Sequence, residues 1–283
     1  MFDRFIAVDW SAANAPRTGG DSIWVAVAEG DEPVQAVNPS TRAAAMALVD
    51  RLCATGRTLA SFDFAFGYPA GSDALPEAGK WPDVWTWIGA NVADGADNRS
   101  NRYEVASRLN GAFGATGPFW GHPHQHEGRY PFLAPTKPDY AELGVRERRA
   151  CERIVPRAQP VWKLAYTGSV GSQALLGIKR LEEWRQALGE DAAVWPFQTG
   201  FADDLGARIV IAEIYPSLWP VERNGASCLD EAQVRTIADL MRRHHRDGRL
   251  EAMLGGPSDA TMRAEALTCE GWIYGVGNTV LAA

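Results

Sequence analysis

The chain of 283 residues has no long hydrophobic run, few cysteines and no excess of positive charge. No apolar segment approaches the ~20 residues that a membrane-spanning helix needs, so no membrane partner is expected. Residues 1–4 lead directly into a strand-like run and show no signal-peptide pattern. Its 4 cysteines are scattered and form no Cys-x-x-Cys pair, which is typical of reduced thiols in a cytoplasmic protein. We therefore expect a cytoplasmic location.

The net charge of −7 argues against indiscriminate binding of nucleic acid, although a local basic groove remains compatible with it. Internal repeats and low-complexity segments are also absent from the sequence. The hydrophobic share of 46% is enough for a sizeable core in a chain of this length. The composition predicts a globular protein and leaves its oligomeric state open.

Three strand-like apolar runs each end in a carboxylate. They are residues 5–9, 59–63 and 209–213, which end in Asp9, Asp63 and Glu213. Open α/β sheets bind ligands at the carboxyl ends of their strands. A buried carboxylate is costly unless it is paired, hydrogen-bonded or protonated. Three acids at one sheet edge therefore predict a metal site.

The order of the predicted elements favours an α/β fold with a mixed sheet. Strands are expected at residues 4–9, 22–29, 33–37, 58–64 and 208–215. Helices are expected at residues 41–54, 82–91, 102–109, 143–154, 172–188, 230–245 and 258–274. The first three strands form an antiparallel meander, and the helix that follows makes a crossover to a parallel strand.

The middle of the chain differs in composition from the two ends. Residues 68–207 are rich in Trp, Pro and Gly and hold few strand signals. We expect them to form a large, mostly helical insertion that covers the catalytic edge of a core made by residues 1–67 and 208–283. Such a cover would exclude long duplexes and admit a small or single-stranded substrate.

A fourth acid could come from the last expected helix. Glu265 shares a helical face with Met262, Cys269 and Trp272, which should pack on the sheet. An acid drawn inward in this way needs a partner or a function. Asp259 and Glu270 are the alternatives for the same position.

The sequence resembles a prokaryotic family of unknown function whose members are regarded as predicted nucleases of the RNase H-like fold. The matching segments are residues 8–9, 63–69, 98–110, 117–121, 161–164, 168–172, 212–216 and 265–267. The resemblance implies an RNase H-like sheet and an acid on the final helix. The family often has Asp where this chain has Glu265, and the longer side chain would displace the ligand atom.

The acids suit one kind of chemistry. Two divalent ions about 3.5–4 Å apart stabilise the attacking and leaving oxygens of phosphoryl displacement. Mg²⁺ or Mn²⁺ would be held by carboxylates from several elements. We expect a metal-dependent nuclease or phosphodiester hydrolase with a nucleic acid or nucleotide-like substrate. The predicted catalytic metal ligands are Asp9, Asp63, Glu213 and Glu265.

Substrate contacts are predicted from the Gly- and Ser-rich stretch at residues 167–179. It misses the Walker A spacing, so it is either a turn with Ser172 as N-cap or a phosphate clamp with Ser169 and Lys163. Trp120 is expected to contact substrate. Five tryptophans could either stack on exposed bases of the substrate or form the core of the expected insertion. They are Trp81, Trp85, Trp87, Trp120 and Trp162.

Three further interpretations are compatible with the sequence. If residues 122–126 are extended, His122, His124 and His126 project to one side and could bind zinc. The strand order and residues 255–257 also suit an actin-like ATPase or sugar-kinase relative, although no Gly follows Asp9. Finally, the acids could be remnants in a catalytically degenerate binding protein.

Overall fold

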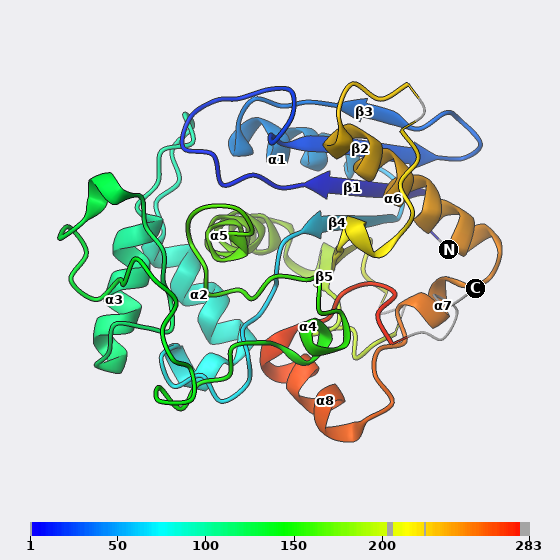
Figure 1. Ribbon diagram of the computed structural model, residues 1–283. Helices are drawn as coiled ribbons and strands as arrows, with labels where there is room; N and C mark the ends of the chain where they lie inside the picture. Colours follow the sequence, from blue (N-terminus) through cyan, green and yellow to red (C-terminus); the bar gives the residue numbers. More distant parts are fainter. Residues whose placement is uncertain (1, 203–205, 224, 278–283) are drawn as a thin grey trace.

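One six-stranded mixed sheet forms the centre of the protein, as described by a computed structural model for residues 2–202, 206–223 and 225–277 (Figure 1). The strands are β1 (Arg4–Asp9), β2 (Trp24–Glu29), β3 (Gln35–Val37), β4 (Thr58–Asp63), β5 (Ala192–Val194) and β6 (Ile209–Glu213). Their order is β3-β2-β1-β4-β6-β5. The pairs β3-β2 and β2-β1 are antiparallel, and the remaining pairs are parallel. The expected α/β class, with a meander followed by parallel strands, is confirmed.

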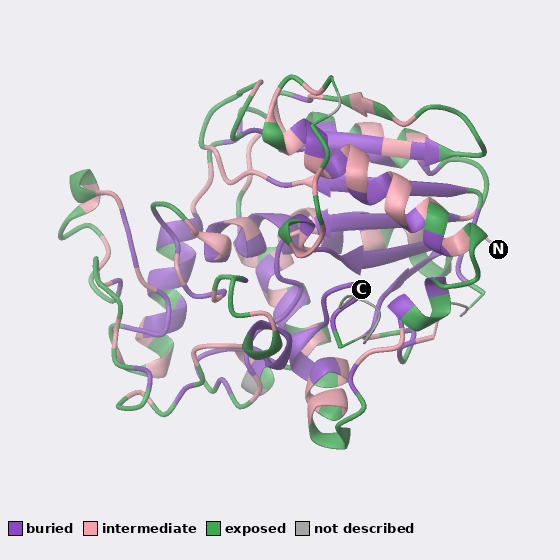
Figure 2. Ribbon diagram, turned by 45° about the vertical axis from the view of Figure 1, so that its right-hand side comes forward, coloured by how far each residue is buried: buried purple, intermediate pink, exposed green. Residues whose placement is uncertain are grey.

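Helices cover both faces of this sheet. They are α1 (Arg42–Leu52), α2 (Trp81–Asn91), α3 (Arg102–Phe113), α4 (Ala150–Ile154), α5 (Val170–Leu188), α6 (Leu229–Arg246), α7 (Leu250–Met253) and α8 (Ala260–Glu265). None of these described helices is long and apolar enough to cross a bilayer. Figure 2 shows that the central strands are buried.

Alternation along the strands divides the buried residues into two hydrophobic cores. Ile6 and Phe62 belong to the core that includes residues of α1, α2, α3 and α5. Ala7 and Val210 belong to the other core, which includes one face of α6. That face is formed by Val234, Ile237, Ala238 and Met241, a spacing that places apolar side chains on one side of a helix. Helix α6 therefore packs against β1 and β2.

The segment expected as an insertion contributes to the sheet and to its core. Residues 192–194 form the edge strand β5, whose three apolar residues are too few to give a strand signal. Figure 1 shows α2 and α3 on the side toward which the β1 and β4 arrows point. Residues 203–205 of the expected insertion and 278–283 of the expected core lie outside the described residues.

Two expected helices are shorter than predicted. Of residues 143–154, only α4 at Ala150–Ile154 is helical. The expected helix 258–274 is α8 followed by a π-helix at Ala266–Glu270 and ends at Gly271, which has φ +66°. Gly271 combines this φ with a ψ of −170°, a conformation that glycine adopts far more readily than other residues.

The loop after β4 packs directly on this π-helix. A Cβ atom at Gly67 would lie 2.1 Å from the carbonyl oxygen of Cys269, so no larger residue fits there. The backbone N–H of Tyr68 donates to the same oxygen at 3.2 Å. The end of β4 is thereby fixed against the C-terminal part of the chain.

Candidate functional site

Asp9 and Asp63 are neighbours at the carboxyl ends of two parallel strands. They are register partners across β1 and β4, so their side chains leave the sheet on the same face. This is the face on which Ala7 and Leu59 contact the core under α6. The structure therefore brings together the first two acids singled out from the sequence.

The environment of these two carboxyl groups opposes their ionisation. Burial, and then the negative charges of Asp63 and Asp230, raise the pKa of Asp9 well above its ordinary value. Burial, followed by the charges of Glu213 and Asp230, raises the pKa of Asp63 to about 8. Burial and the neighbouring acids therefore disfavour simultaneous ionisation of the two carboxyl groups.

Asp230 is a functional candidate that the sequence analysis did not identify. It lies in the first turn of α6 and lines the same cavity as Asp9. Its carboxylate accepts a hydrogen bond of 2.6 Å from the backbone N–H of Asp21, and a helix N-terminus favours negative charge. The available signal was an acid at the start of the helix that follows β6. Only the packing of α6 shows that this position faces Asp9.

Glu213 has a different environment from the one predicted. It pairs in register with Phe62, not with Asp63, so it leaves the sheet on the opposite face. Its side chain is only 3% exposed, and Arg149 donates to both carboxylate oxygens at 2.6 and 2.8 Å. The N–H of Phe66 also donates to this carboxylate at 2.9 Å. Glu213 is therefore the partner of a buried arginine, and it also lines a cavity of about 110 Å³ together with Asp63.

Glu265 lies in a second cavity of about 580 Å³. Its Oε1 contacts Arg146 at 2.6 Å. Of the two alternatives, Asp259 caps the start of α8, and Glu270 accepts hydrogen bonds from the N–H groups of Ala70 and Ala150. Each of these acids already has a structural partner, and none of them lines the cavity beside Asp9.

The predicted substrate residues are also divided between two environments. Ser169 lines the cavity beside Asp9. Ser172 is buried, and its hydroxyl donates to the carbonyl of Leu164 at 2.6 Å. The ammonium of Lys163 donates to the carbonyl of Thr167 and lies 5.4 Å from the Trp120 ring centroid. Lys163 and Trp120 are outside the residues that line the cavity.

Other aromatic and glycine positions have structural explanations. The side chains of Trp85 and Trp162 are fully buried, and Trp81, Trp87 and Trp120 pack partly buried against the same core. These rings are therefore chiefly core residues. Gly256 belongs to residues 255–257, the segment that suits a kinase-like relative. The Phe201 ring packs so closely on it that a Cβ atom at this position would lie 2.3 Å from the ring.

The three histidines do not form the extended row on which the zinc prediction depended. Residues His124–His126 form a 3₁₀ turn. His122 is buried next to the carbonyl of Pro123, whereas the His126 ring contacts Tyr103 and Tyr130. The ring of His124 lies 6.1 Å from the ring of Tyr166, so the three histidine rings have different contact partners.

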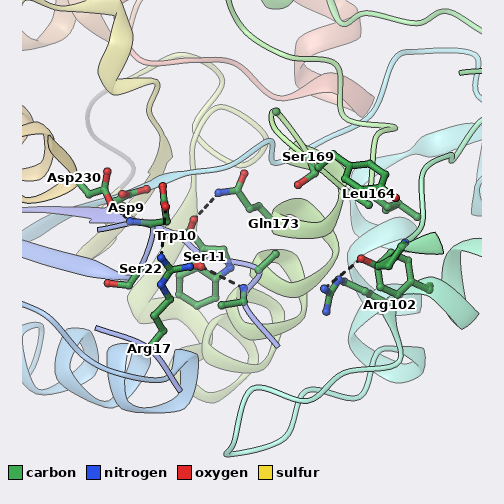
Figure 3. A pocket seen from close by; sticks show the side chains of 18 of the residues that line it. Asp9, Trp10, Ser11, Arg17, Ser22, Arg102, Leu164, Ser169, Gln173 and Asp230 are labelled. Atoms are coloured by element: carbon green, nitrogen blue, oxygen red, sulfur yellow. Dashed lines mark hydrogen bonds and ion pairs between the residues drawn. The ribbon is translucent and has the colours of Figure 1, made fainter. Parts of the chain in front are cut away.

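A cavity of about 500 Å³ opens beside Asp9 (Figure 3). Figure 3 shows Asp9 and Asp230 at one end and Arg102 at the other, with Ser169 and Gln173 between them. The side-chain amide of Gln173 donates to the carbonyl of Trp10 at 2.5 Å. Gln173 also lines a smaller cavity of about 110 Å³ that contains Asp63. Gln173 therefore lies between the cavity next to Asp9 and the cavity next to Asp63.

The donor chemistry fits a hard divalent cation held by few protein ligands. In the described ranges, no group of three or more His, Cys, Asp or Glu side chains is arranged to hold a metal ion. Mg²⁺ commonly takes one or two carboxylates and completes its shell with water and substrate phosphate oxygens. Asp9 and Asp63 match that pattern, and Asp230 adds a nearby negative charge.

The raised pKa of Asp63 predicts a pH-dependent loss of stability in metal-free protein. Between the ordinary pKa of 3.8 and about 8, the folded state holds a proton that the unfolded state releases. The free energy of unfolding therefore falls as pH rises through this window. Asp63→Asn cannot titrate, so its melting temperature should exceed the parent's by a few degrees at about pH 9, with a smaller difference at about pH 5. Calorimetry in EDTA measures the two melting temperatures at each pH. An equal difference between the variant and the parent at the two pH values would contradict the prediction.

Comparisons of the chain with protein-family models, with curated proteins and with solved structures gave no match.

Proposed function

We propose that the protein is a divalent-metal-dependent phosphodiester hydrolase of the RNase H-like type, acting on a nucleic acid or nucleotide-like substrate. The observation that carries this proposal is the register pairing of Asp9 with Asp63 at the carboxyl ends of β1 and β4. Asp230 completes an acidic site from α6. The strand order and the sequence resemblance support the RNase H-like assignment.

Asp9 and Asp63 would hold Mg²⁺ or Mn²⁺, and their raised pKa values mean that metal binding displaces protons. A bound ion of this kind supplies charge stabilisation for a scissile phosphate and lowers the pKa of a bound water. Asp230 holds the loop at Asp21 through its backbone N–H and so shapes the cavity. Gln173 fixes the backbone at Trp10, next to Asp9.

Removal of the metal tests this function. Hydrolysis of short single-stranded DNA and RNA, and of a generic phosphodiester, should require Mn²⁺ or Mg²⁺ and fall to background in EDTA. Restoring the ion should restore the rate, and the ion concentration that gives half-maximal activity should fall as pH rises toward about 8, because the metal competes with the Asp63 proton. A rate that is unchanged in EDTA, or no hydrolysis of any of these substrates with either ion, would refute the proposal.

A thermal-shift measurement with a nucleoside triphosphate distinguishes the proposed hydrolase from the alternative kinase-like function. ATP with Mg²⁺ should raise the melting temperature of an ATPase strongly, because a ligand that binds only the folded state stabilises it. We expect this shift to be small for the hydrolase. A large shift accompanied by ATP cleavage would favour the rival.

A further inference from the structure

Arg102 is a buried cation with no carboxylate partner among the residues that the structure describes. It is the first residue of α3 and is only 7% exposed. Its guanidinium donates to the hydroxyls of Ser172 at 3.0 Å and Ser100 at 2.7 Å, and to the side-chain oxygen of Asn14 at 3.2 Å. Within the described residues it forms no ion pair. The guanidinium also donates to the Tyr103 hydroxyl at 3.5 Å and lies 4.7 Å from the centroid of the Tyr103 ring. Buried charges are normally paired with an opposite charge, whereas these described partners of Arg102 are uncharged groups.

The surroundings of Arg102 make this charge more unusual. Asp94 is the nearby acid, but its carboxylate already pairs with Arg42 at 2.6 Å and with Arg180 at 2.7 Å. The first turn of a helix also disfavours a cation, because its backbone N–H groups carry partial positive charge. Desolvation lowers the pKa of Arg102 in this setting. A fold that keeps a cation here would be stabilised by an external anion.

The cavity beside Asp9 gives an anion access to Arg102. Arg102 forms one end of this cavity of about 500 Å³, which is within the usual size range of small-molecule sites (Figure 3). Ser169 also lines it and makes no capping hydrogen bond to α5, so its hydroxyl is available as a donor. A phosphate group is an anion that both side chains can bind.

Tyr166 places an exposed aromatic ring on the same cavity. Its side chain is 54% exposed, and its backbone has φ +69°, a region that non-glycine residues seldom adopt. The Tyr166 hydroxyl donates to the carbonyl of His122 at 3.2 Å, which fixes the ring position. Such strain persists where surrounding structure enforces it, often at binding sites. An exposed ring of this kind can stack on a nucleobase.

We propose that this cavity binds one nucleoside monophosphate unit at the phosphorylated end of a strand, with the phosphate at Arg102 and the base on Tyr166. Its connection with cleavage at Asp9 rests on the proposed hydrolase function. Binding of the unit itself needs neither metal nor hydrolysis, so the two proposals can fail separately.

Isothermal titration calorimetry in EDTA tests the site with adenosine 5′-monophosphate, inorganic phosphate and adenosine. The monophosphate should bind more tightly than either part, and phosphate should compete with it. Arg102→Gln should weaken monophosphate binding about tenfold or more, because a charge-assisted contact is lost. Tyr166→Ala should weaken it about fivefold to a hundredfold while leaving phosphate binding unchanged.

The matched control is Arg108→Gln on the same helix. Arg108 is exposed, contacts Asn91 and Trp87, and lies outside this cavity, so its substitution should leave all three affinities unchanged. If Arg102→Gln does not fold, Ser169→Asp provides a second variant, since an added carboxylate should repel the phosphate and lower affinity at least about tenfold.

Two outcomes would overturn the site. One is equal binding of adenosine and its monophosphate, and the other is undiminished monophosphate binding in folded Arg102→Gln or Ser169→Asp. Monophosphate binding is measured in EDTA, so it does not depend on the metal that the hydrolase function requires. Binding by the parent without any metal-dependent hydrolysis would therefore refute the hydrolase function and leave the nucleotide site standing.

Discussion

Asp9→Asn is expected to lower metal-dependent hydrolysis about a thousandfold or more while the fold is retained. The substitution keeps the shape of the side chain but removes an anionic oxygen ligand. A loss of about 4 kcal/mol of transition-state stabilisation corresponds to such a factor. Because burial and neighbouring acids oppose ionisation of Asp9, the neutral amide should also leave the metal-free protein at least as stable as the parent.

Steady-state rates at saturating Mn²⁺, together with thermal melting, measure both effects. Asp83→Asn is a matched control, because Asp83 is an exposed acid in the first turn of α2. Asp230→Asn should have an intermediate effect, roughly 10–100-fold, as expected for a group near the metal ligands that holds the loop at Asp21 and adds negative charge beside Asp9. If Asp9→Asn hydrolyses the substrates as fast as Asp83→Asn, Asp9 does not bind the catalytic ion.

Arg149→Met is expected to lower the free energy of unfolding by about 3–5 kcal/mol. Arg149 is buried and makes ion pairs with Glu213 at 2.6 Å and Glu152 at 2.7 Å. Removal of the guanidinium leaves two buried carboxylates without a cation, and this arrangement is more costly than the absence of the whole network. Urea denaturation with unchanged m-value measures the loss.

Arg146→Met is the control for this substitution, three residues earlier in the chain. Arg146 pairs with Glu265 at 2.6 Å, but its side chain is half-exposed, so its loss should cost only about 0–1 kcal/mol. The double variant Arg149→Met with Glu213→Gln should recover part of the stability, because one unpaired charge is removed. A loss in Arg149→Met no larger than that in Arg146→Met would show that the network does not stabilise the fold.

Local patterns in the sequence predicted most of the sheet. Five strands were expected close to their observed positions, because each combines an apolar run with a turn signal. Strand β5 was missed since three apolar residues look the same in a helix, a strand or a loop. The position of Asp9 and Asp63 at one sheet edge also followed from local information, as both acids end strands that the crossover makes parallel, whereas their register pairing is seen only in the structure.

The rest of the site depends on information that a single sequence does not contain. A register shift of one residue places Glu213 beside Phe62 and sends its side chain to the other face. The identity of its partner, Arg149, requires contact across 64 positions of the chain. Asp230 likewise became a candidate only once α6 had been placed on the sheet.

Glu270 has a consequence for the order in which the chain can assemble. Its carboxylate accepts hydrogen bonds from Ala70, 200 positions earlier, and from Ala150, 120 positions earlier. During synthesis on the ribosome both amides must remain hydrated until residue 270 has been made, because their protein acceptor does not yet exist. The loop that follows Asp63 can therefore take its final position only after nearly all of the described chain has been translated.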